Sequence, residues 1–197
     1  MSGILESLYD KIAPVYNWTI GPSLEGARKK AIEFANIQKG ERVLEVGVGT
    51  GLTFRHLPPE IDFVGVDLSE KMLAQALKNE KKLGLNYELL KMDASKLSFP
   101  DESFDLVISA HFLSATSNPI PAILEMKRVV KKTGRVLLVN NFPKAEYLAH
   151  LMEPLAHKLG FSMKLNLEEL CAKTGFRVQK RISASKVLPI DAVLLIP

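Results

Sequence analysis

The sequence lacks the features that place a protein outside a reducing compartment or across a membrane. It holds one cysteine, Cys171, in 197 residues, so no internal disulfide forms and a reducing compartment is favoured. No run approaches the ~18 uninterrupted apolar residues of a membrane-spanning helix. Met1–Asp10 has neither the basic patch nor the apolar run of a secretory signal. We therefore expect a cytoplasmic protein that at most lies on the inner face of a membrane.

Metal ligands are also sparse. His56, His150 and His157 are not grouped with cysteine or carboxylates, and we expect no metal site.

The net charge is only +4, but residues 1–121 carry 13 basic against 16 acidic side chains, whereas residues 122–197 carry 13 against 6. A basic second half suits an anionic partner such as a phospholipid surface or a nucleic acid, and a merely solvated basic face explains it equally well.

The apolar pattern changes period repeatedly along the chain. It predicts strands at 42–46, 62–67, 87–92, 104–109, 134–139, 177–182 and 187–196. It predicts helices at 2–15, 23–36, 52–57, 69–83, 121–130, 144–159 and 167–173. Strands that alternate with helices over short connections indicate a mostly parallel sheet covered by helices on both faces. The fold class is therefore α/β, doubly wound.

The strongest motif is the glycine loop Glu45-Val-Gly-Val-Gly-Thr-Gly51, between the first sheet strand and a helix. A dinucleotide fingerprint would need its third glycine at position 52, which is Leu52. The loop has no lysine, which excludes a nucleoside-triphosphate P-loop. The Glu45 carboxylate would repel a pyrophosphate but favour an amino group and a sulfonium. These features favour S-adenosylmethionine.

Two more acidic residues follow later strands. Asp67 ends the second strand, 20 residues beyond Gly47, where a carboxylate can accept hydrogen bonds from both ribose hydroxyls. Asp93 follows the third strand and can accept from an adenine amine, while Ala94 offers its backbone N–H. Either aspartate alone fits a turn or a helix cap equally well, but their order along the chain supports a nucleoside site.

These motifs, with Val64-Gly-Val-Asp-Leu-Ser69 and Phe99-Pro-Asp-Glu-Ser-Phe-Asp105, resemble those of class I S-adenosylmethionine methyltransferases. The resemblance implies a Rossmann-like sheet of seven strands with the last strand antiparallel. It implies a methyltransferase domain at 37–197 after a helical lid at 1–36, and S-adenosylhomocysteine as the product. The cofactor-binding residues that it implies are Tyr16, Glu45, Gly47, Gly49, Thr50, Gly51, Asp67, Leu68, Met72, Asp93, Ala94 and Ser109.

Two segments bear on the methyl acceptor. Tyr9-Asp-Lys-Ile-Ala-Pro-Val-Tyr16 resembles the lid of lipid-acting methyltransferases, although Asn17 stands where the family often has aspartate. The stretch from Ser109 to Pro119 resembles that of bacterial phospholipid N-methyltransferases, and it lacks the Arg-Asn pair usual in quinone methyltransferases. The Asn/Asp-Pro-Pro-aromatic motif of enzymes that methylate nucleic acid bases is also missing, so we expect no nucleic acid partner.

The expected activity is N-methylation of phosphatidylethanolamine, and of its mono- and dimethyl products, at an anionic membrane surface. Tyr9 and His111 are the predicted catalytic residues. With a pKa near neutrality, His111 would accept the amine proton, or it would only position the acceptor. The alternatives are methylation of a quinone precursor or another small apolar molecule, and a non-catalytic S-adenosylmethionine-binding protein. The oligomeric state stays open.

Overall fold

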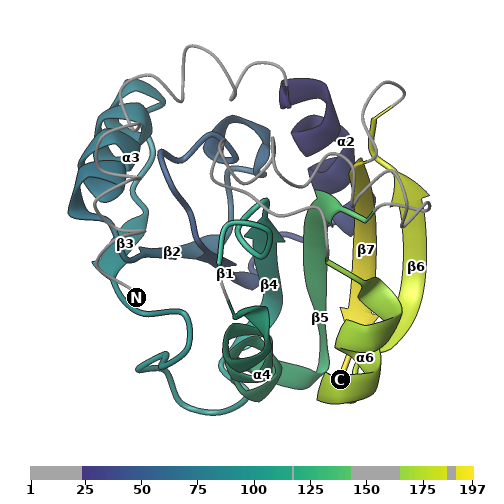
Figure 1. Cartoon of the computed structure of the whole chain (residues 1–197). Helices are drawn as coiled ribbons and strands as arrows, with labels where there is room; N and C mark the ends of the chain where they lie inside the picture. Colours follow the sequence, from purple (N-terminus) through teal and green to yellow (C-terminus); the bar gives the residue numbers. More distant parts are fainter. Residues whose placement is uncertain (1–23, 117, 143–164, 186–189) are drawn as a thin grey trace.

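The structure is a computed structural model that describes residues 24–116, 118–142, 165–185 and 190–197. Within them the strands form one seven-stranded sheet in the order β3-β2-β1-β4-β5-β7-β6 (Figure 1). The strands are β1 (Arg42–Val46), β2 (Asp62–Asp67), β3 (Glu88–Lys91), β4 (Phe104–Ala110), β5 (Val130–Asn141), β6 (Arg177–Ser183) and β7 (Ile190–Ile196).

Strand direction confirms the predicted topology. Strands β1 to β5 pair in parallel, and β7 pairs antiparallel with both β5 and β6. The chain runs outward from β1 to β3 and then returns to the other side of β1 with β4. Ligands of open α/β sheets bind beyond the carboxyl ends of the strands at such a switch point. The topology therefore directs attention to the ends of β1 and β4.

The helices are α2 (Glu25–Ala35), η1 (Phe54–His56, a 3-10 turn), α3 (Glu70–Lys82), α4 (Pro119–Val129) and α6 (Leu167–Thr174). Their buried residues divide the core into two clusters, one on each face of the sheet. Helices α4 and α6 share the first cluster. Helices α2 and α3 and the turn η1 share the second. Figure 1 shows α4 and α6 together at the lower front, and α2 and α3 at the top.

Local sequence explains where these elements begin and end. The Ser69 side chain caps α3 by accepting from the Met72 amide at 3.2 Å. Asn166 caps α6 in the same way, and Gly175 ends that helix in the left-handed conformation (φ 68°). Strand β4 is almost continuously apolar and nearly all buried, as expected of a strand with helices on both faces.

The predicted helix at 52–57 is wrong. Residues 52–53 form a turn, and only Phe54–His56 are helical, as a single 3-10 turn. Leu57 is already extended (φ −73°, ψ 142°) because it precedes Pro58, and a residue before proline disfavours the helical conformation. The predicted strand at 134–139 is longer than expected and spans Val130–Asn141. The predicted helix at 144–159 lies outside the described residues.

Part of the predicted lid packs as a core element. Ala27, Ala31, Ile32 and Ala35 of α2 are buried in the second core cluster against the sheet. Residues 1–23, which include the predicted helix at 2–15, lie outside the described part of the chain. The boundary near residue 37 stays a prediction. Among the described residues, no helix is long and apolar enough to span a bilayer.

Candidate active site

The glycine loop turns sharply after β1. Gly47 and Gly51 have φ angles of 74° and 75°, a region that other residues rarely adopt. A Cβ at Gly47 would stand 2.6 Å from Phe112, and one at Gly51 would overlap the Phe54 ring. The Gly47 and Val48 amides donate to the Val66 carbonyl at 2.9 and 3.0 Å, which joins the loop to β2. The loop therefore requires glycine at both positions, and it brings backbone close to any ligand at this edge.

Asp67 holds the same loop from the end of β2. Its two carboxylate oxygens accept from the Gly49 amide at 2.8 Å and the Ser69 amide at 2.9 Å. The buried Thr50 is fixed as well, because its carbonyl accepts from the Asn79 side chain at 2.8 Å. Sequence reasoning assigned Asp67 to a ribose and missed this anchoring of the loop. A ribose contact remains a prediction.

Glu45 is a buried carboxyl under the loop. Its side chain is 1% exposed, and Oε1 accepts from the Thr53 hydroxyl at 2.6 Å. Oε2 is buried and has no hydrogen-bond partner. Burial raises the pKa of Glu45 to about 7, against the lowering effects of the Thr53 hydrogen bond and the Arg28 charge. A buried oxygen without a partner is costly, and a ligand ammonium would satisfy it.

Arg28 is a buried cation near the candidate site that sequence reasoning did not single out. It lies on α2, is 4% exposed, and has Nη1 3.7 Å from a Glu25 carboxylate oxygen. Its charge lowers the pKa of both Glu45 and His111, so it lies within electrostatic reach of both. The available signal was its place on the apolar stripe of the helix, at i−3 and i−4 from Ala31 and Ile32.

Ser109 and His111 stand at the carboxyl end of β4. Ser109 is 1% exposed, and its Oγ is buried without a hydrogen-bond partner. His111 follows the strand with φ 62°, and its amide donates to the Val139 carbonyl at 2.7 Å. Its Nε2 is likewise buried without a partner. Backbone held in the left-handed region by a non-glycine residue is typical of functional sites.

The expected near-neutral pKa of His111 is wrong. Burial, together with the charge of Arg28, lowers the pKa of this imidazole to about 3. A side chain with that pKa stays neutral at physiological pH and cannot hold a proton taken from an amine. It can still donate or accept one hydrogen bond at Nε2. This lowered pKa does not fit the role of proton acceptor, and the positioning role of His111 stays a prediction.

Asp93 lies in an exposed turn after β3. Its Oδ1 accepts from both the amide and the hydroxyl of Ser95 at 2.8 Å, and its carbonyl accepts from the Lys96 amide. Such a turn, closed by the side chain of aspartate, is a common local structure. Ala94 is partly buried beside it. The predicted contacts of Asp93 and Ala94 with adenine remain a prediction.

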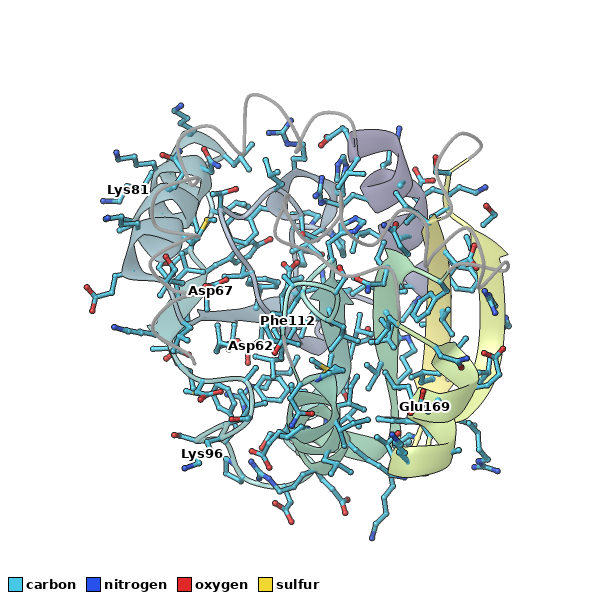
Figure 2. The ribbon with its side chains drawn as sticks, in the orientation of Figure 1. Asp62, Asp67, Lys81, Lys96, Phe112 and Glu169 are labelled. Atoms are coloured by element: carbon cyan, nitrogen blue, oxygen red, sulfur yellow. The ribbon has the colours of Figure 1, made fainter. Side chains whose placement is uncertain are left out.

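The sheet order brings these positions to one edge. Strands β3, β2, β1 and β4 are neighbours, so Asp93, Asp67, the loop after Glu45, and His111 lie along consecutive carboxyl ends. Asp67 and Phe112, labelled in Figure 2, come from the ends of β2 and β4, on either side of the glycine loop. Leu68 and Met72 follow Asp67, and Met72 is buried. The predicted site residues Tyr9 and Tyr16 lie outside the described residues.

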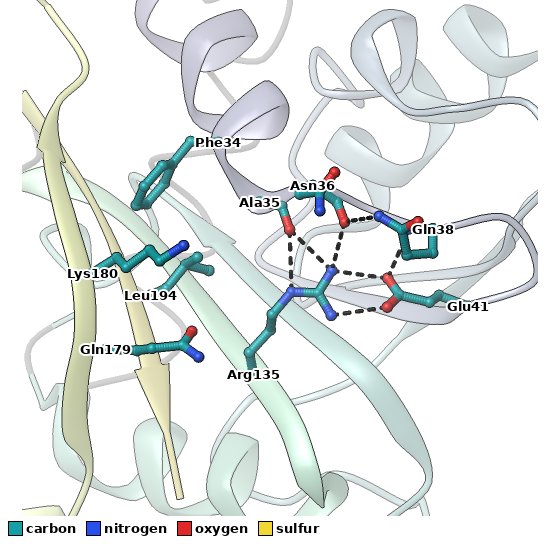
Figure 3. A pocket seen from close by; sticks show the side chains of 9 residues that line it. All are labelled: Phe34, Ala35, Asn36, Gln38, Glu41, Arg135, Gln179, Lys180 and Leu194. Carbon is teal, nitrogen blue, oxygen red and sulfur yellow. Dashed lines mark hydrogen bonds and ion pairs between the residues drawn. The ribbon is translucent and has the colours of Figure 1, made fainter.

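One cavity, of about 330 Å³, lies at the opposite edge of the sheet, near the amino end of β1 (Figure 3). Arg135 on its wall donates to the Ala35 and Asn36 carbonyls and to both Glu41 carboxylate oxygens. These bonds use the hydrogen-bond donors of the guanidinium and hold the carboxyl end of α2 in place. Among the described residues, no group of three His, Cys, Asp or Glu side chains is arranged to hold a metal ion.

Several basic residues of the second half of the chain are paired with acidic residues in the fold. Arg128 pairs with Asp101, Lys131 with Asp105, and both cations meet acids from the first half of the sequence. Other cations of this half are also paired: Lys132 with Glu102, Arg135 with Glu41, Lys173 with Glu169, and Arg181 with Asp191. Part of the charge imbalance along the sequence is therefore balanced locally on the part of the chain that the structure describes.

Comparison with known proteins identifies the family. A family model described as a methyltransferase domain matches residues 44–138. A phosphatidylethanolamine N-methyltransferase of Cereibacter sphaeroides is 34% identical over 87% of this chain and 87% of its own length. The chain belongs to the S-adenosylmethionine-dependent methyltransferases. A demethylmenaquinone methyltransferase of Listeria welshimeri is 32% identical over 69% of this chain and 61% of its own.

The fold of this methyltransferase agrees with solved relatives. A SAM-dependent methyltransferase from Aquifex aeolicus superimposes with a TM-score of 0.69 at 20% identity, over 98% of each chain. The predicted enzyme class and cofactor, S-adenosylmethionine, are confirmed. The residues present fit this cofactor, because the glycine loop turns with backbone angles that keep main chain at the carboxyl edge of the sheet, and Glu45 keeps a buried carboxylate oxygen for an ammonium.

Proposed function

We propose that this methyltransferase transfers methyl groups to the amine of phosphatidylethanolamine and of its mono- and dimethyl products. The observation that carries the proposal is the 34% identity to the Cereibacter phosphatidylethanolamine N-methyltransferase, which spans 87% of both chains. A match of that extent includes more than the shared cofactor domain. The segment from Ser109, with its resemblance to phospholipid N-methyltransferases, supports the same acceptor.

The proposed cofactor contacts follow from the carboxyl edge of the sheet. Glu45 binds the amino group, the glycine loop supplies backbone contacts, and Asp67 binds the ribose while it holds the loop. When bound, S-adenosylmethionine supplies a methyl group that is already activated on a sulfonium, so that S-adenosylhomocysteine remains after transfer. The protein then needs mainly to align the acceptor with this methyl group.

The acceptor amine is proposed to lie beside His111. A primary ammonium has an ordinary pKa of about 10 and must lose a proton before it can attack. Withdrawal from water next to Phe112 lowers that pKa by disfavouring the charged form. Neutral His111 accepts a hydrogen bond from the amine at Nε2, which directs the nitrogen lone pair. In this proposal the proton leaves to water, since the pKa of His111 is about 3.

Access to a lipid requires contact with a bilayer. We propose that the enzyme acts at the inner face of the membrane and binds it peripherally, through the amphipathic pattern of residues 2–15. Ile4, Leu5, Leu8 and Ile12 recur there at helical spacing. Several cations of residues 122–185 are already paired with acidic side chains. We therefore assign the membrane attachment to the N-terminal segment.

A second candidate acceptor is a quinone precursor. The 32% identity to the Listeria demethylmenaquinone methyltransferase favours it, although that match covers 61% of the relative. The chain also lacks the Arg-Asn pair that is usual in quinone methyltransferases after the fourth strand. We therefore place it second.

The test is methyl transfer from labelled S-adenosylmethionine to anionic vesicles with and without phosphatidylethanolamine, with products resolved by lipid mass. Stepwise gains of one to three methyl groups are expected. A parallel reaction with demethylmenaquinol measures the second candidate under the same conditions. Label that enters the quinol but not the lipid, from protein shown to bind the cofactor, would refute the lipid proposal.

A further inference from the structure

A row of polar side chains crosses the sheet at the carboxyl end of β5. Asn140 of β5 pairs with Asp191 of β7, which in turn pairs with Ser183 of β6. On the other side, the last pair of β4 and β5 joins Ala110 and Val139, so the next position on each strand holds His111 and Asn140. Asn140 therefore lies next to the proposed position of the acceptor amine.

The side-chain amide of Asn140 is buried, and its N–H₂ donor has no hydrogen-bond partner. Its side chain is 1% exposed, and Nδ2 has no hydrogen-bond partner. Oδ1 lies 3.5 Å from the Ser114 hydroxyl. Most buried polar groups in proteins are paired, so an unpaired amide nitrogen in a strand end needs an explanation. An amide N–H₂ donates and cannot accept, so the missing partner is an acceptor atom.

Ser109 supplies a second open group on the same face. It pairs with Leu138, two residues before Asn140, and side chains two apart along a strand point to the same side. Its buried Oγ has no partner either, and a hydroxyl can donate. The two groups come from adjacent strands and lie on the face that α4 and α6 cover.

This pair of donors carries no net charge. The Asp191 carboxylate next to Asn140 accepts from Arg181 at 2.8 and 2.6 Å, so that charge is balanced within the row. Neutral N–H and O–H donors can bind an oxygen anion, and no second cation is needed. An ammonium cannot bind at the amide nitrogen, because both groups are donors. The position therefore suits the oxygen end of an acceptor whose amine lies at His111.

We propose that Asn140 and Ser109 form a subsite for an anionic oxygen of the methyl acceptor, and that this subsite positions the acceptor for transfer. The inference rests on the proposed function for the identity of that oxygen. In a phosphatidylethanolamine it is a phosphodiester oxygen, and in a quinol precursor it is a phenolate oxygen. Both oxygens can accept hydrogen bonds from the Asn140 amide and the Ser109 hydroxyl.

The test compares Asn140→Leu, Asn140→Asp and Ser109→Ala with the wild-type enzyme. The matched control is Asn141→Leu, one residue along β5, where the side chain lies on the opposite face of the sheet. Each protein is assayed for KM on vesicles of phosphatidylethanolamine and phosphatidylglycerol, for KM on demethylmenaquinol, and for cofactor Kd. Binding of glycerophosphoethanolamine to the S-adenosylhomocysteine complex is titrated as a direct readout.

We expect Asn140→Leu to raise the acceptor KM about 10- to 100-fold, the effect of losing a hydrogen bond to a charged group. Asn140→Asp should raise it further by repelling the anion, although the side chain keeps its shape. Cofactor Kd should stay within about twofold in the Asn140 variants, and Asn141→Leu should leave KM unchanged. For Ser109→Ala, a position that the family resemblance assigns to the cofactor, acceptor KM should rise more than cofactor Kd. A purely structural role would weaken cofactor binding and acceptor binding together, because a buried carboxylate beside Asp191 also disturbs the fold.

The outcomes separate the two proposals. Unchanged acceptor KM in Asn140→Leu and Ser109→Ala, or tighter binding in Asn140→Asp, would overturn the subsite and leave lipid methylation standing. A wild-type enzyme that methylates the quinol alone, with KM dependent on Asn140, would keep the subsite and refute the lipid. If Asn140→Leu does not fold, Ser109→Ala and the fragment titration decide.

Discussion

Replacing Glu45 by glutamine tests the electrostatics of the site most directly. Glutamine has the shape of the protonated acid, and its Oε1 can still accept from Thr53. Burial raises the pKa of Glu45 from its ordinary 4.5 to about 7, so the folded protein holds the proton more firmly than the unfolded chain. Stability from this group is fully present below pH 4.5 and is lost as the pH rises through about 7.

The magnitude follows from that pKa. At about 1.4 kcal/mol per pH unit, ionising Glu45 costs the ligand-free protein about 3 kcal/mol above pH 7. Glu45→Gln avoids this cost and should be more stable by that amount at about pH 8, but equally stable near pH 4.5. For a domain of this size we expect a rise in Tm of about 6–12 °C at the higher pH.

Thermal unfolding without cofactor, followed by circular dichroism near pH 4.5 and 8, measures the effect. Glu125→Gln is the control with opposite sign, because hydrogen bonds from Arg128 lower the pKa of Glu125 and its loss should destabilise at neutral pH. Calorimetry should show cofactor affinity about 10- to 100-fold weaker in Glu45→Gln, since a charge-assisted hydrogen bond is lost. An equal stability change at both pH values would refute the reasoning.

Three further substitutions probe other parts of the site. Gly47→Ala should destabilise by about 1–3 kcal/mol in urea unfolding, because φ is 74° and the added Cβ meets Phe112 at 2.6 Å; wild-type stability would contradict the loop geometry. Asp67→Asn should weaken cofactor binding about 10-fold or more by calorimetry, with a loss of stability near 1 kcal/mol for one backbone bond; unchanged affinity would exclude Asp67 from the cofactor site. Because the imidazole pKa of His111 is lowered to about 3 in the folded protein, the wild type should lose about 1.4 kcal/mol of stability per pH unit below about pH 6. His111→Gln should not show this loss. An unchanged acid-unfolding profile would place His111 in contact with water.

Apolar periodicity predicted where the described strands lie along the chain, because the central strands carry buried apolar runs of their own, whereas the edge strands β3 and β6 are partly or largely exposed. Strand β4 is a continuous apolar run between polar turns, and no distant partner is needed to recognise it. The predicted helix at 52–57 failed because its apolar spacing was read without the effect of Pro58 on Leu57. Residues near 130 joined β5 through an irregular pairing with Phe104, which local pattern does not encode.

The cofactor loop could be predicted for the same reason. Gly47 and Gly51 are required by backbone angles and close contacts, and such requirements leave a visible residue type at a set spacing. No residue type or spacing in the sequence singled out Arg28 or Asn140 in the same way. Their importance comes from burial and from unpaired or charged neighbours on other elements, which only the packed fold brings together.

What the sequence determined by itself is therefore the positions of the strands along the chain, the glycine loop and, from its carboxylates, a cationic nucleoside as cofactor. The tertiary structure alone decided how charges and protons behave. It shielded the His111 Nε2 atom from water and so lowered a pKa expected near neutrality to about 3. It paired Arg128 and Lys131 with acids from the first half of the chain, so these two positive charges are balanced locally. The physical reason is that electrostatic energy depends on distance in space and on access to water, and neither is a property of neighbours in sequence.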